Sequence, residues 1–134
     1  LFVFGVGCVF GYLGYYYTNT SLSASYTTEE RYRENTHMTQ VLAQENTDID
    51  PDSTVTTIES AYKKFLTDET TYTVAVYTVD EEALSGYDKD LETIRGMSKS
   101  KAKAVAEDGV MEKVGTATIV LNTKTDEVLS FSMK

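Results

Sequence analysis

Residues 70–79 read TTYTVAVYTV and contain only threonine, tyrosine, valine and one alanine. β-Branched and aromatic side chains suit the half-buried surface of a sheet, and they lose rotamer freedom in a helix. We therefore expect a strand here, around which the rest of the domain is built.

Two more strands are expected near the C-terminus. Residues 112–121 and 128–133 alternate apolar side chains with threonine or serine, and the polar residues 122–127 join them as the loop of a hairpin. Together with residues 70–79 they predict a three-stranded antiparallel sheet. The side chains expected on the apolar face of the hairpin are Ala117, Ile119, Leu121, Leu129, Phe131 and Met133.

Helical patterns occupy the remaining acidic part of the chain. Thr27 and Glu30 fit a capping box at the start of the first helix, and Gly96 and Gly109 are expected to end the last two. Helices packed on one face of a small antiparallel sheet define an α+β fold. The predicted helices are residues 28–46, 53–67, 80–95 and 98–107. The clearest amphipathic pattern is that of residues 53–67, with Val55, Ile58, Tyr62, Phe65 and Leu66 at helical spacing.

Charge divides the chain sharply. Residues 1–28 carry none, whereas all 12 basic and 21 acidic side chains lie from Glu29 onward and give a net charge of −9. We infer a hydrophobic segment (1–17), a polar uncharged linker (18–28) and an acidic α+β domain (29–134). Because such a domain repels polyanions, we expect no nucleic acid partner.

The first 17 residues, LFVFGVGCVFGYLGYYY, predict an assembly or membrane segment. As a helix they would span about 26 Å, slightly less than the ~30 Å hydrocarbon core of a bilayer. Glycines at this spacing let two helices approach closely, and a lipid-facing anchor with incidental glycines is the alternative. The segment also reads as a strand that pairs with the sheet edge of a neighbour. The residues expected at the assembly contact are Leu1, Phe2, Phe4, Gly7, Gly11 and Gly14.

Four carboxylates between residues 48 and 59 have the spacing of positions 1, 3, 5 and 12 of a twelve-residue calcium loop. Ser53 replaces the glycine that such a loop needs for its sharp turn, and Pro51 stiffens it. An acidic helix N-terminus, favoured by the helix dipole, is the alternative interpretation. Calcium is the one cofactor considered, with Asp48, Asp50, Asp52 and Glu59 as candidate ligands.

The sequence offers little for catalysis. His37 and Cys8 are the only histidine and cysteine, which are too few ligands for a zinc site. A Ser-His-Asp set would need His37 near a nucleophile, and we expect His37 to be exposed instead. Neither GxxxxGK[ST] nor GxGxxG occurs. Lys99, Lys101 and Lys103 spread round a helix and are interpreted as solvated, with a contact to the acidic face of another copy as the alternative. We do not expect an enzyme.

An apolar N-terminal segment, a longer polar helix and a small sheet domain, in this order, resemble the type IV pilins and pseudopilins. In that family the N-terminal helices pack into a filament core and the globular heads form its outside. Leu1 matches a mature N-terminus of the family. Gly5 stands where the family has a glutamate, so no functional residue is transferred from it.

We therefore expect a structural subunit of an extracytoplasmic, pilus-like filament. Residues 1–17 would bind copies of the same chain, and the lipid bilayer would hold them before assembly. The protein would be extracellular or at the cell surface. The alternative is a single-pass, membrane-anchored accessory subunit or assembly factor of a membrane complex.

Overall fold

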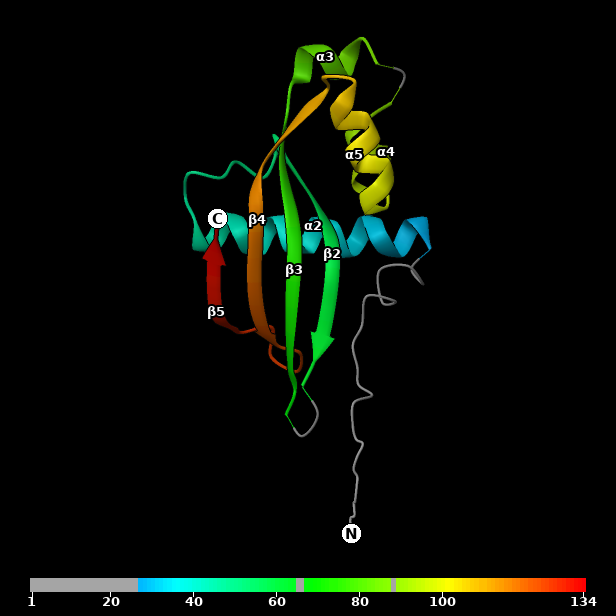
Figure 1. Cartoon of the computed structure of the whole chain (residues 1–134). Coiled ribbons are helices and arrows are strands. Elements are labelled where there is room, and N and C mark those ends of the chain that lie inside the picture. Colours follow the sequence, from blue (N-terminus) through cyan, green and yellow to red (C-terminus); the bar gives the residue numbers. More distant parts are fainter. Residues whose placement is uncertain (1–26, 65–66, 88) are drawn as a thin grey trace.

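The computed structural model describes residues 27–64, 67–87 and 89–134 (Figure 1). The fold is α+β, as the sequence predicts. Its elements are α2 (Thr28–Glu45), β2 (Thr54–Lys63), β3 (Glu69–Val79), α3 (Glu81–Ser85), α4 (Leu91–Arg95), α5 (Lys99–Glu107), β4 (Met111–Asn122) and β5 (Val128–Met133).

The four described strands form one antiparallel sheet in the order β2-β3-β4-β5. Figure 1 shows α2 lying across the strands on one side of the sheet. The three helices between β3 and β4 gather at one end of the sheet, and the β4–β5 loop lies at the other. One end of the sheet therefore carries helices that the other end lacks.

α2 closes the larger of two apolar clusters. Its Met38 and Leu42 are fully buried, and so are Val74 of β3 and Ile119 of β4 in the same cluster. Burying one such side chain contributes roughly 1.5–3 kcal/mol. A few well-buried residues thus hold α2 on the sheet, although its apolar stripe is narrow.

The second cluster lies on the opposite face of the sheet. Ala75, Tyr77 and Val79 of β3 belong to it, together with Ile94 of α4 and Val105 of α5. Successive strand residues point to opposite faces, so β3 supplies both clusters in turn. The predicted placement of helices on one face is therefore wrong, because helices contact both.

The predicted helix at residues 53–67 is also wrong, since most of it forms strand β2, which makes the sheet four-stranded. Residues 54–58 are all β-branched and favour a strand. A β-bulge at Glu59 then shifts the alternation, so that Ile58 and Ala61 both belong to the cluster under α2. Val55 and Ile58, which the predicted helix places on one stripe, therefore belong to clusters on opposite faces of the sheet.

Residues 80–95, predicted as one helix, form the two short helices α3 and α4. Asp80 and Asp90 each accept hydrogen bonds from backbone N–H groups at the start of a helix. Gly86 ends α3, and Gly96 ends α4 as predicted. Asp90 therefore starts a second helix within residues 80–95, although the spacing of the apolar residues alone predicts one continuous helix.

The other predicted elements are confirmed, with one correction. The capping box of α2 forms in both directions, between Thr27 and Glu30. Gly109 follows α5 with a φ of 84°, a conformation that glycine adopts at little cost. The C-terminal hairpin is present, but a bulge leaves Leu129 44% exposed and packs Val128 against the core instead.

A buried polar network joins α2 to β2 and α4. The Asn35 carbonyl accepts hydrogen bonds from Thr39 Oγ1 (2.9 Å) and Thr56 Oγ1 (2.6 Å). Asn35 Nδ2 donates to the Arg95 carbonyl (2.7 Å), and the Arg95 side chain donates to two backbone carbonyls at the start of β2. All four side chains are buried, so a group that loses its partner costs about 1–3 kcal/mol.

Two adjacent threonines of β2 are predicted to respond oppositely to loss of the hydroxyl. Thr56→Val removes a donor to the Asn35 carbonyl and should lower the free energy of unfolding by about 1–2 kcal/mol. Thr57→Val should leave it unchanged or raise it by up to about 1 kcal/mol, because Thr57 Oγ1 is buried without a hydrogen-bond partner among the described residues. Urea denaturation measures both. Equal losses of unfolding free energy in the two variants would contradict the hydrogen bond of Thr56 and the unpartnered hydroxyl of Thr57 among the described residues.

Candidate functional site

Among the described residues, one face of the sheet is covered at only one end. Val55, Tyr77 and Met111 lie under α4 and α5 in the second apolar cluster. Figure 1 shows no described helix in front of the other half of the strands. That half is the candidate interaction surface of the domain.

Two rows of mostly hydroxyl side chains cross this half. None belongs to either apolar cluster, all are partly or fully exposed, and Tyr62 is 49% exposed. We call these residues the hydroxyl face. In the register of the four strands, one row is Ser60, Thr73, Thr118 and Ser132, and the next is Tyr62, Thr71, Val120 and Ser130.

The chemistry of the hydroxyl face suits a polar partner. Each hydroxyl can donate one hydrogen bond and accept others. The strands hold these groups at a repeat of about 4.8 Å across the sheet. The face is uncharged, so a partner of either charge can approach it without direct contact between like charges.

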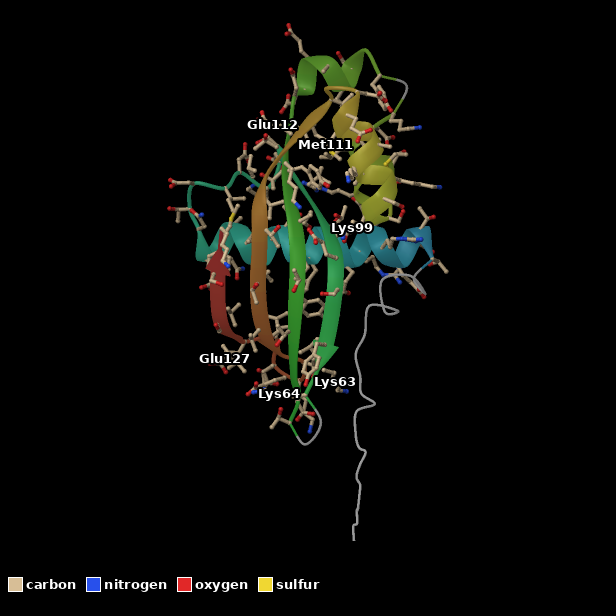
Figure 2. The ribbon with its side chains drawn as sticks, in the orientation of Figure 1. Lys63, Lys64, Lys99, Met111, Glu112 and Glu127 are labelled. Atoms are coloured by element: carbon tan, nitrogen blue, oxygen red, sulfur yellow. The ribbon has the colours of Figure 1, made fainter. Side chains whose placement is uncertain are left out.

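A charge cluster lies between the hydroxyl face and α5. Glu59, the extra residue of the β2 bulge, has Oε1 3.5 Å from Lys99 Nζ and Oε2 3.2 Å from Lys113 Nζ. Figure 2 shows Lys99 at the start of α5, near the end of the sheet where the helices gather. Both lysines are about half exposed, so these ion pairs contribute little, about 0–1 kcal/mol each, and we interpret the cluster mainly as a contact that positions α5 against β2 and β4.

Tyr77 is packed beside this cluster and is 3% exposed. Burial raises the pKa of its phenol above the ordinary value near 10, Lys113 acts in the opposite direction, and Glu59 adds to the rise. The neutral phenol is therefore the form that the folded domain favours.

The predicted calcium ligands occupy two different settings. Asp48, Asp50 and Asp52 are exposed in the loop between α2 and β2, where Asp50 Oδ1 accepts a hydrogen bond from the Asp52 N–H (3.0 Å). Glu59 lies on a strand and contacts two lysines, whereas a calcium loop takes its last ligand from an exiting helix. In residues 27–64, 67–87 and 89–134, no group of three or more His, Cys, Asp or Glu is placed to hold a metal ion. Calcium binding stays a prediction.

The residues predicted for assembly, Leu1, Phe2, Phe4, Gly7, Gly11 and Gly14, lie outside the described residues. The three lysines of α5 spread round the helix as predicted, because Lys99 and Lys103 line one cavity and Lys101 lines another. His37, predicted to be exposed, is partly buried on α2, with Nε2 3.9 Å from Asp126 Oδ1.

Comparison of the chain with models of protein families, with curated proteins and with solved structures gave no match. Within the part of the chain that the structure describes, no helix is long and apolar enough to cross a bilayer. The resemblance to pilins therefore stays a prediction.

Alkaline titration is expected to detect the buried phenol of Tyr77. Its folded pKa is raised, so its contribution to stability is complete below about pH 10 and is lost as the pH rises through the folded value. Tyr77→Phe should make the free energy of unfolding fall less steeply above about pH 10 and remove a late step from the ultraviolet titration of tyrosinate. Tyr62→Phe, on the hydroxyl face, is the matched control. Identical profiles for Tyr77→Phe and the unmodified chain would contradict this role for burial.

Proposed function

We propose that the chain is a structural subunit of an extracytoplasmic, pilus-like filament. Residues 1–17 hold copies together, and the acidic domain forms the outside. The division of charge carries this proposal: 28 residues without a charged side chain precede a domain that gives the chain its net charge of −9. A strongly charged exterior keeps a polymer soluble.

The way the chain enters the domain supports the same proposal. Residues 27–30, where α2 begins, are all exposed. Every buried residue of α2 lies from Asn35 onward, and Figure 1 shows the first turns of α2 extending past the edge of β2. The uncharged stretch therefore joins the domain at its surface, as a segment that contacts neighbouring copies requires.

The order of elements supports it as well. The helix that follows the apolar segment packs across an antiparallel sheet. A helix and then a sheet are the features on which the resemblance to pilins and pseudopilins depends. Before the filament assembles, the lipid bilayer holds residues 1–17, and during assembly copies of the same segment replace the lipid.

A second candidate function is an accessory subunit or assembly factor anchored in a membrane complex. The hydroxyl face favours this candidate, because an uncovered polar surface suits an unlike partner with many hydrogen-bonding groups. The two candidates differ in what residues 1–17 bind, which is a second copy in the first and different chains in the second.

Negative-stain microscopy of the full chain separates the two functions. The filament proposal predicts long polymers. Gly11→Leu should abolish them if closely packed helices form the core, because the added side chain forces the helices apart. Val9→Leu, an apolar change in the same segment, is the matched control and should leave polymers intact.

Discrete particles in place of polymers, or co-purification with other chains in a fixed ratio, would favour the accessory subunit. Polymers that persist in Gly11→Leu would contradict helix packing and point to strand donation. A chain that forms neither polymers nor stable complexes would contradict both candidate functions.

A further inference from the structure

A cavity of about 460 Å³ lies between α2, α4 and α5. Among the described residues, its charged lining side chains are Arg31, Lys89 and Lys101, and none is a carboxylate. This is unusual in a chain with 21 acidic and 12 basic side chains. Cavities of roughly 300–1,000 Å³ are the size that binds small ligands.

The other cavities described in this domain mix both charges. The cavity beside Tyr77 has Glu59 and Glu107 among its lysines, and the cavity beside α3 has Asp52 and Asp90 beside Lys89. The cavity at the middle of α2 has Glu34 and Asp126 beside Arg33 and His37. The all-basic lining therefore sets the first cavity apart from these three.

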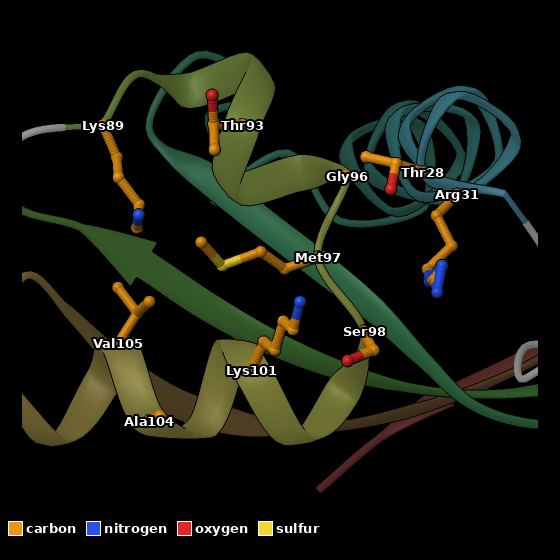
Figure 3. Close-up of a pocket in the computed structure, with 10 residues that line it drawn as sticks. All are labelled: Thr28, Arg31, Lys89, Thr93, Gly96, Met97, Ser98, Lys101, Ala104 and Val105. Carbon is orange, nitrogen blue, oxygen red and sulfur yellow. The ribbon is translucent and has the colours of Figure 1, made fainter.

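Two of the three basic groups extend toward a partly apolar floor. Figure 3 shows Lys89 and Lys101 extending from opposite sides toward Met97, with Arg31 on the side of Ser98. Val105 completes the apolar part. This arrangement suits a ligand that has an anionic group and a short organic portion.

Lys89 and Lys101 differ from the four lysines of the domain that form ion pairs. Lys64, Lys99, Lys113 and Lys124 each lie within 3.5 Å of a carboxylate oxygen. Within the described ranges, neither Lys89 nor Lys101 has a carboxylate within ion-pair distance, and Lys89 Nζ lies 5.8 Å from the centre of the Tyr87 ring. Their charges are therefore available to an external anion.

The start of α5 adds to the positive electrostatic potential of the cavity. Its N-cap, Ser98, makes no side-chain capping hydrogen bond, and its first turn contains no acidic residue. By contrast, α2, α3 and α4 all have glutamates in their first turns. The positive end of the α5 dipole thus faces the cavity without a carboxylate of its own first turn to neutralise it.

We propose that this cavity binds a small phosphate ester. A phosphate accepts charge-assisted hydrogen bonds from several basic side chains at once, and the apolar floor accommodates the ester portion. The net charge of −9 does not forbid this, because salt screens charges beyond about 8 Å at physiological ionic strength. The site does not depend on how residues 1–17 assemble.

The phosphate could belong to a soluble ester or to a lipid headgroup. Thr28, which lines the cavity, is the first residue of α2, where the uncharged stretch joins the domain. If that stretch lies in a bilayer, the cavity faces a surface rich in phosphate. The two sources share one chemistry, and the experiment separates them.

The test uses the full, isotope-labelled chain in nonionic detergent micelles and follows its backbone amides by NMR at constant ionic strength. Glycerol 3-phosphate, with inorganic phosphate as the minimal probe, should shift the amides of residues 96–101 in a saturable way. Lys101→Gln and Lys89→Gln should each weaken binding about tenfold. Lys103→Gln, on the same helix, and Arg33→Gln, on α2, are matched controls and should change it less than twofold.

A second arm replaces the soluble probes with phosphatidylglycerol added to the micelles. Shifts with the soluble probes alone assign a soluble ester, and shifts with the lipid alone assign a headgroup; either supports the site. Absence of saturable shifts with every probe would overturn the proposal. So would equal weakening by Lys101→Gln and Lys103→Gln, because the effect would then be one of general charge. Well-dispersed spectra of all variants confirm that they fold.

Discussion

The hydrogen bonds around Asn35 decide where α2 lies on the sheet. Apolar contacts are not directional, so the few apolar residues of α2 do not fix its position along the strands. Asn35 does, because its carbonyl accepts from a hydroxyl of β2 and its amide donates to α4. Gly96 allows this close approach, since a Cβ there would lie 2.9 Å from Thr28 Cγ2. The cavity between α2, α4 and α5 is a consequence of this contact.

The central strand explains the rest of the surface. β3 buries side chains on both faces at the end where α4 and α5 pack, so its sequence is almost continuously apolar there. Toward Glu69 its outward positions are Thr71 and Thr73, which no described helix covers. Two bulges, at Glu59 and near Val114, interrupt the regular pairing, and Glu59 contacts the lysines of α5 and β4. The charge cluster of Glu59, Lys99 and Lys113 thus lies between the hydroxyl face and the half of the same sheet face that α4 and α5 cover.

Local patterns predicted most of the elements but not their partners. The α+β class, the capping box at Thr27, the strand at residues 70–79 and the hairpin all follow from short-range rules. The spacing of Val55 and Ile58 predicts a helix over β2, but in the strand these two side chains belong to clusters on opposite faces of the sheet. A helix at this place leaves out Ser60 and Tyr62, the β2 members of the two hydroxyl rows, and the ion pairs of Glu59 with lysines. The basic cavity is assembled from three helices, and no spacing along the chain reveals it.

The proposed function requires that residues 1–17 form a contact surface that copies of the chain or lipid shield from water. Sedimentation velocity of the unmodified full chain, with and without detergent, tests this most directly. We predict large assemblies in plain buffer and small, uniform particles in detergent. A single species at the monomer mass of 14.9 kDa in plain buffer would contradict this role of residues 1–17.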